Sequence, residues 1–144
     1  MSSLTLTDLA EKMRDIDFAM LSTRTDNGAI AARPMSNNRD VDYNGDSFFF
    51  AYGTTRTVSD IERDPSVGLV FQGKKSLLGK PPIFVAVEGR ADLVRDKDAF
   101  KSHWAPDLDH WFENGIDTPG LVMIHVHAAR IHYWDGFDEG ELRV

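Results

Sequence analysis

The sequence contains no cysteine, and none of its apolar runs approaches the ~20 residues that a membrane-spanning helix needs. The missing thiols exclude a disulfide scaffold, a thiolate nucleophile and a zinc site built on thiolates. The first 13 residues lack both the basic start and the long apolar stretch of a signal peptide. We therefore expect a cytoplasmic protein with no membrane partner.

Basic residues are scarce as well. Lysine and arginine number 16 against 23 aspartates and glutamates, which gives a formal net charge of −7. A field of this sign does not attract nucleic acid, so an anionic ligand would need a local cluster of donors. The sequence also has no nucleophile elbow, P-loop or dinucleotide-binding glycine motif. Its carboxylates form no recognisable catalytic pair, and we assign no catalytic residue.

What the chain does have is enough length and apolar content for one packed domain. Its 144 residues are 42% hydrophobic, which predicts a single domain over residues 1–144. Short apolar segments recur too closely for repeated β-α-β crossovers. We expect a mainly β fold, a six- to seven-stranded antiparallel barrel with two to three short helices at its periphery. The expected strands are residues 18–23, 29–37, 47–52, 67–72, 83–95, 121–127 and 130–134.

Helix caps and turn residues lie between these expected strands. Thr7 is the expected N-cap of a helix that runs to Arg14, and Asp96 that of a helix ending near residue 104. Another helix is expected over 55–63, with Thr54 or Thr55 as its cap and Asp64-Pro65 as its stop. A further helical turn is expected at 108–112. Asn27-Gly28 and 43–46 read as turns, and Gly89 as a β-bulge.

The start of the 55–63 helix is the first candidate site. A helix N-terminus exposes unpaired N–H groups at the positive end of its dipole, which suits a phosphate. Thr55 and Thr57 add hydroxyl groups there, and Arg56 adds a planar charged donor. The alternative is an ordinary threonine cap beside a solvated arginine.

Three weaker candidates follow. Pro34 cannot donate to a sheet ladder, so Arg33-Pro34-Met35 is expected at an edge or bulge, where a ligand has access. Trp134 ends the last expected strand and can stack on a flat ring, or simply fill a barrel end. His125 and His127 share one strand face, but no third ligand with suitable spacing is evident in the sequence, and we predict no metal site.

Taken in order, these segments resemble the pyridoxamine 5′-phosphate oxidase-like family of flavin-binding split barrels, and within it the general stress protein branch. The resemblance covers almost the whole chain. It is carried by five segments in the correct order: FAMLST, ARPM, SFFFAYGTTRTVSDIERDPSVGLVF, VAVEGRADLVRD and RIHYWDG.

The resemblance implies a split β-barrel homodimer with flavin mononucleotide (FMN) at the subunit interface, and FAD as the alternative cofactor. It places Arg33 near the phosphate or ribityl chain and the 55–57 segment on the phosphate. It also implies that Trp134 approaches the flavin from the partner subunit. The residues that it implies for the cofactor are Arg33, Pro34, Met35, Ser36, Phe50, Ala51, Thr55, Arg56, Thr57 and Trp134.

Three functions stay open at this stage. The first is a flavin-dependent oxidoreductase that uses a nicotinamide reductant or a small acceptor; the chain stops soon after WDG, so activity on pyridoxamine phosphate is not expected. The second is a non-catalytic flavin carrier or stress-response protein. The third is a split barrel that binds no flavin. Two departures from the family suggest it: Thr57 stands where many relatives have lysine, and Phe84 stands where the oxidases often have glutamine. Its haem-binding version would use His125, His127 or His132.

Overall fold

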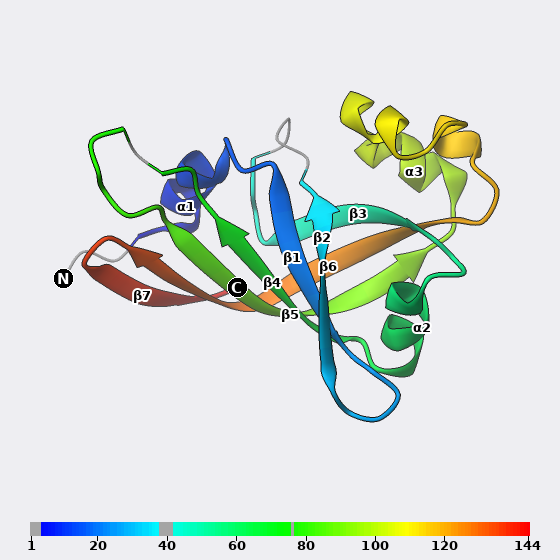
Figure 1. The fold of residues 1–144 in the computed structure, drawn as a ribbon, viewed down its shortest axis with the longest axis horizontal. Coiled ribbons are helices and arrows are strands. Elements are labelled where there is room, and N and C mark those ends of the chain that lie inside the picture. The colour runs from blue at the N-terminus through cyan, green and yellow to red at the C-terminus, as the bar shows by residue number, and fades with distance from the viewer. Residues whose placement is uncertain (1–3, 38–41, 76) are drawn as a thin grey trace.

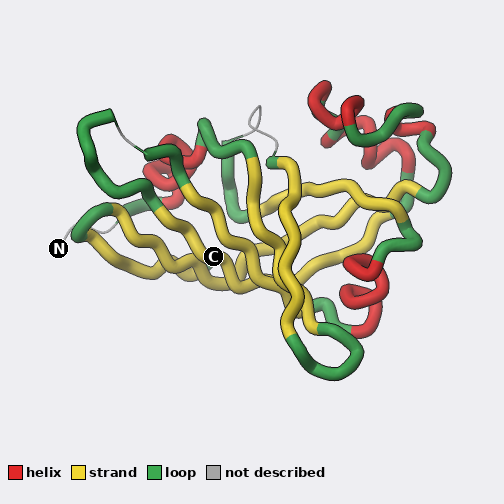
Figure 2. Tube along the Cα trace, in the orientation of Figure 1, coloured by secondary structure: helices red, strands yellow, loops and turns green. Residues whose placement is uncertain are grey.

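Seven antiparallel strands form one sheet in the computed structural model, which describes residues 4–37, 42–75 and 77–144. The strand order is β2-β1-β4-β5-β6-β3, and β7 pairs with β6 beyond this path. Helices lie around the sheet (Figure 2). The strands are β1 (Phe18–Arg24), β2 (Ile30–Ser36), β3 (Asp46–Tyr52), β4 (Ser66–Gln72), β5 (Phe84–Val94), β6 (Leu121–Asp135) and β7 (Asp138–Arg143).

The longest strand, β6, differs most from the sequence prediction. The expected break between two strands at 128–129 is wrong: the ladder continues through it to β5. One edge of β6 pairs first with β3 and then, from residue 130 onward, with β7. β7 was not predicted, because its sequence, DEGELR, is mostly exposed and lacks an alternating apolar pattern. The predicted bulge at Gly89 is confirmed, since the β5–β6 register shifts between Glu88 and Gly89.

Three α-helices and two 3-10 turns flank the sheet. They are α1 (Leu6–Met13), α2 (Arg56–Arg63), α3 (Lys97–His103), η1 (Pro106–His110) and η2 (Gly115–Asp117). Figure 1 shows α1 toward one end of the molecule, with α2 and α3 toward the other. The predicted caps Thr55 and Asp96 are confirmed. None of the helices in the described residues is both long and apolar enough to cross a bilayer.

The first helix begins two residues before the predicted position. Its N-cap is Thr5, not Thr7, because Thr5 and Asp8 form a reciprocal capping box. The Thr5 hydroxyl accepts from the Asp8 amide at 3.1 Å, and the Asp8 carboxylate accepts from the Thr5 amide at 2.8 Å. These contacts satisfy two N–H groups, whereas Thr7 has no acidic partner three residues later.

Two apolar clusters stabilise this arrangement. The larger one joins α1 and α2 to the sheet and includes the fully buried Leu9, Phe71 and Tyr133. The smaller one joins α3 and η1 to the ends of β3 and β6 through Phe50, Phe100, Leu108, Phe112, Leu121 and Met123. The second cluster therefore holds the 3-10 segment over the end of β3, where the candidate site lies.

Candidate functional site

A cleft of about 350 Å³ opens between the edge strand β2, the end of β3, the start of α2 and the 3-10 segment η1. This volume lies within the range of small-molecule sites, roughly 300–1,000 Å³. Of the ten residues proposed from the sequence, eight line it: Arg33, Pro34, Met35, Ser36, Phe50, Ala51, Thr55 and Thr57. Strands and helices far apart in the sequence thus bring three of the predicted segments to one place.

Strand β2, which is one of the free edges of the sheet, forms one wall. Among the described strands it pairs only with β1, and Pro34 lies opposite Met20 in that ladder. The expectation that Pro34 belongs at a sheet edge is therefore confirmed, and its missing N–H costs no central ladder bond. The other edge of β2 has no neighbouring strand in the described residues, and its residues 33–36 line the cleft.

The Arg33 guanidinium is directed inward, toward β1 and α2. Its Nη1 donates to the Thr23 hydroxyl at 2.8 Å and to the carbonyl of Leu21 at 3.2 Å. Its Nη2 lies 3.7 Å from the buried Asp60 carboxylate. Burial lowers the pKa of Arg33, the negative charge of Asp60 opposes that shift, and the nearby positive charge of Arg56 adds to it. Arg33 therefore lines the cleft with a positively charged side chain whose position is held by Thr23, Leu21 and Asp60.

The start of α2 supplies hydroxyl groups and a helix N-terminus to the cleft. The Thr55 hydroxyl caps the helix by accepting from the Val58 amide at 3.4 Å, and it donates to the Tyr52 carbonyl at 2.9 Å. Thr57 is buried and faces the cleft. Arg56 is exposed at the first helical position and does not line the cleft, although it lies near enough to Arg33 to affect its pKa.

Aromatic side chains make the opposite wall. The rings of Tyr52 and Phe112 lie 5.1 Å apart between centroids, and Phe50 contacts Trp104 edge-on at 4.8 Å. Trp111 is largely exposed at the mouth. Five lining residues were not predicted from sequence: Phe18, Tyr52, Leu108, Trp111 and Phe112. No sequence motif marks these five residues; Phe18 and Trp111 stand out only in the structure, where both large apolar side chains are exposed.

The remaining predicted residue, Trp134, does not line the cleft. It lies near the end of β6, opposite Phe84 of β5, and stacks on the His132 ring with 4.0 Å between centroids. In Figure 1 the β6–β7 turn lies at the end of the molecule opposite α2. Within one chain, Trp134 and the α2 N-terminus therefore belong to different regions.

A curled antiparallel sheet whose edge strand and peripheral helices enclose a cleft defines a split-barrel protein. The family model described as "Pyridoxamine 5'-phosphate oxidase like" matches residues 5–143. The chain belongs to this pyridoxamine 5′-phosphate oxidase-like family, as its sequence segments predicted.

Individual relatives agree with this assignment. Protein bli-3 of Neurospora crassa is 25% identical over an alignment of 137 positions that covers 89% of this chain and 63% of that protein; the chain thus spans less than two thirds of this relative. A solved structure from Clostridium acetobutylicum, of a protein related to general stress protein 26, has a TM-score of 0.79 at 16% identity, covering 96% of this chain and 94% of that one.

A second solved structure bears on the open alternatives. The heme-binding protein of Mycobacterium smegmatis has a TM-score of 0.74 at 15% identity, and the match covers 99% of this chain and 60% of that one. At such identities the likeness concerns the fold alone. It shows that this split barrel occurs in a protein named for binding heme.

Proposed function

We propose that this protein binds FMN in the cleft beside β2 and acts as a homodimeric flavin-dependent oxidoreductase on a small acceptor. The observation that carries the proposal is the composition of the cleft. One end has the hydroxyls of Thr55 and Thr57 at a helix N-terminus, and the wall opposite β2 is aromatic. A phosphate at the first end and a flat ring against the second would match those surfaces.

The residues present fit the cofactor in charge as well as in shape. The protein is acidic overall, but Arg33 and Arg56 are close enough to influence each other electrostatically beside α2. Because Asp60 and the Thr23 hydroxyl already hold Arg33, its role would be to keep this end of the cleft positive. Arg56 is exposed and would supply the direct charge-assisted contact to the phosphate.

Flavin, when bound, supplies the electron or hydride transfer, so the chain has to bind the ring, orient it and shield it from water. Among the described residues that line the cleft there is no aspartate, glutamate, histidine or lysine. Among the described lining residues, the Tyr52 phenol is the side chain left that could transfer a proton. This composition keeps a non-catalytic flavin carrier as the second candidate, which steady-state oxidation of NADH or NADPH by the flavin-loaded protein would separate from the first.

Haem is a poorer fit to the cleft. None of the described residues that line it is a histidine. His125 and His132 each lie within 3.2 Å of a carboxylate oxygen, from Asp46 and Glu139. Both histidines lie outside the cleft, so a haem held by either would not occupy it.

An exposed apolar surface favours the homodimer. Phe18, Met20 and Val70 stand on one face of β1 and β4, with Met20 directly opposite Val70 in the ladder. Phe84 and Trp134 continue this face on β5 and β6. Phe18 also lines the cleft, so the apolar face is continuous with it. A second copy covering this face would bury the apolar side chains and bring its own Trp134 toward the cleft.

The flavin proposal predicts a preference for FMN over riboflavin, which lacks the phosphate. One charge-assisted contact contributes about 1.5–3 kcal/mol, or roughly a 10- to 100-fold difference in affinity. We expect the wild type to show this preference by fluorescence titration, and Arg56→Ala to lose most of it while binding riboflavin unchanged. Arg95→Ala is the control, because Arg95 is exposed and pairs with Glu62 away from the cleft. Equal affinities for both flavins in the wild type would contradict the phosphate site.

The homodimer predicts that the 16.2 kDa chain sediments at twice its mass at micromolar concentration. Met20→Glu places a charge in the middle of the apolar face, so it is expected to give monomers. Ile30→Glu is the control, since Ile30 is exposed at the far end of β2 and does not line the cleft. A monomeric wild type would contradict the dimer and the role of Trp134 together.

A further inference from the structure

A cluster of two histidines and a carboxylate lies on the exposed face where β3 and β6 pair. The sequence places His125 and His127 on one side of β6, and the fold adds Asp46, which stands directly opposite His127 in the β3–β6 ladder. One possible ligand atom from each of the three residues lies within 4.8 Å of the others. The third ligand missing from the sequence pattern is therefore supplied by a residue 79 positions earlier than His125.

The distances within the cluster centre on one oxygen. Asp46 Oδ1 is 3.2 Å from His125 Nε2 and 3.0 Å from His127 Nδ1. The two imidazole rings are themselves close, with centroids 3.8 Å apart. A neutral imidazole carries only one N–H, and a carboxylate oxygen is purely an acceptor. This crowding of acceptors requires either protons on both facing nitrogens or a cation among them.

Asp92 determines which His127 nitrogen is available. Its Oδ2 lies 3.0 Å from His127 Nε2, on the other side of the ring from Asp46. A hydrogen bond from Nε2–H to Asp92 leaves the Nδ1 lone pair directed at Asp46 Oδ1, which would be repulsive without a cation between them. An outer carboxylate that fixes the tautomer of a histidine in this way is the usual second partner of a metal-binding imidazole.

We propose that Asp46, His125 and His127 bind one divalent transition-metal ion of the Zn²⁺ type, with Asp92 orienting His127. Two imidazoles and one carboxylate suit this class of ion, whereas Ca²⁺ and Mg²⁺ prefer all-oxygen sites. Three protein ligands leave a fourth position of a tetrahedral ion open to water. His127 is nearly half exposed, so both the ion and that water can reach the site.

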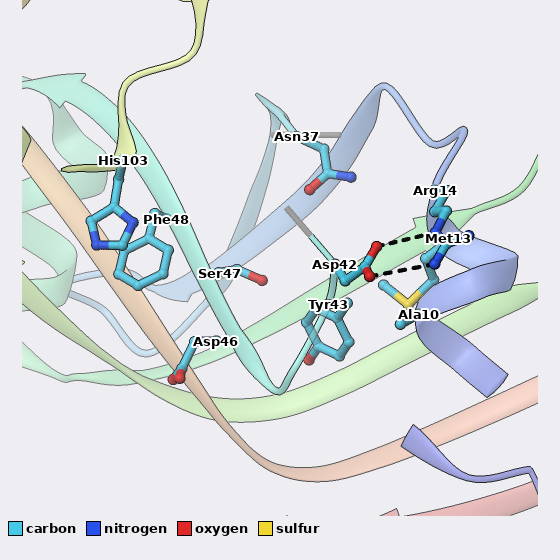
Figure 3. Close-up of a pocket in the computed structure, with 10 residues that line it drawn as sticks. All are labelled: Ala10, Met13, Arg14, Asn37, Asp42, Tyr43, Asp46, Ser47, Phe48 and His103. Carbon is cyan, nitrogen blue, oxygen red and sulfur yellow. Dashed lines mark hydrogen bonds and ion pairs between the residues drawn. The ribbon is translucent and has the colours of Figure 1, made fainter. Parts of the chain in front are cut away.

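The aromatic neighbours hold one of the ligands in place. Phe48 lies opposite His125 in the ladder and stacks on both the His125 ring, at 4.3 Å, and the His103 ring, at 3.5 Å. Figure 3 shows Phe48 against His103, with the Asp46 carboxylate nearby. Burial lowers the pKa of His103, and the nearby His125 lowers it further. A rigid stack on one side reduces the ordering that His125 would need to bind an ion.

The proposed metal site is separate from the flavin cleft. None of the three proposed ligands, nor Asp92, lines that cleft. Metal binding can therefore be measured whether or not the protein carries flavin.

The test is competition for Zn²⁺ between the purified, chelator-treated protein and a chromophoric chelator. We expect one equivalent of Zn²⁺ to bind the wild type. Asp46→Asn and His127→Ala should each weaken binding about 100-fold or more, and Asp92→Asn about 10- to 100-fold. His132→Ala is the matched control on the same strand, because His132 also contacts carboxylates, Glu139 and Glu141, but has no second histidine among these partners. It should leave Zn²⁺ affinity unchanged.

Co²⁺ added to the wild type gives an independent readout, since a tetrahedral site produces intense visible absorption that an octahedral aquo ion lacks. The variants should retain the wild-type circular dichroism in chelator, which separates ligand loss from unfolding. The proposal is overturned if the wild type binds no Zn²⁺, or if His132→Ala weakens binding as much as His127→Ala does. The cluster would then be a histidine–carboxylate ion-pair network only.

Discussion

Asp60→Asn is expected to lower the free energy of unfolding by about 2–4 kcal/mol, because it removes a buried charge that other buried groups need. Asp60 is 2% exposed. Its carboxylate accepts from the Thr23 hydroxyl and from Arg63, both at 2.8 Å, and faces Arg33. The amide of asparagine keeps one acceptor but turns an NH₂ donor toward other donors. Arg33 would then be mostly buried without its counter-ion.

Urea denaturation of the variant and the wild type measures this effect. Glu62→Gln is the matched control: Glu62 lies on the same helix and pairs with Arg95, but both side chains are more than half exposed. Such a pair contributes less than about 1 kcal/mol, so the control should unfold with the wild type. Equal effects of the two substitutions would mean that Asp60 does not organise the base of the cleft.

Gly89→Ala is expected to destabilise the protein by about 2–3 kcal/mol, because its added methyl group has no room. A Cβ at residue 89 would overlap the carbonyl oxygen of His127 and lie 3.1 Å from its carbon. Both atoms belong to the backbone of the neighbouring strand and cannot rotate away. The bulge between β5 and β6 therefore requires glycine at this position.

Gly68→Ala provides the comparison. Gly68 is also a strand glycine, on the adjacent β4, but a Cβ at this position would meet Val87 and Ser22 at ordinary distances of 3.7 and 3.8 Å. The change there should be less than about 1 kcal/mol and is expected to be neutral or stabilising. Thermal unfolding of both variants tests these two expectations. Similar melting temperatures for Gly89→Ala and Gly68→Ala would show that the backbone at the bulge shifts to accommodate the added methyl group.

The sequence predicted well the features that depend on neighbouring residues. The cap at Thr55, the stop at Asp64 and the turn at Gly28, whose φ is +81°, all follow from local conformational preferences. Strand β7 could not be predicted in this way. Only pairing with the long β6 makes a strand of its acidic segment, and Gly140 is needed there because the Tyr133 ring occupies the space of a Cβ.

For the candidate site, the sequence indicated which residues would take part better than it indicated how their side chains are arranged. The segments around Arg33 and Thr55 do meet at one cleft, as the family resemblance implied. The inward direction of Arg33 depends on Thr23 and Asp60, which are distant in sequence and carry no motif. The contribution of Asp46 to the histidine pair depends on strand register, which alternating hydrophobicity alone does not specify between two particular strands.

The position of β6 in the sheet has a consequence for synthesis of the protein on the ribosome. Among the described strands, β3 pairs only with β6, and β5 pairs with β4 and β6. A nascent chain that has not yet released residues 121–135 therefore exposes one edge of β5 and all of β3, the apolar sequence DSFFFAY. Unpaired apolar edges of this kind promote association between chains. The sheet can therefore close only after residues 121–135 have left the ribosome.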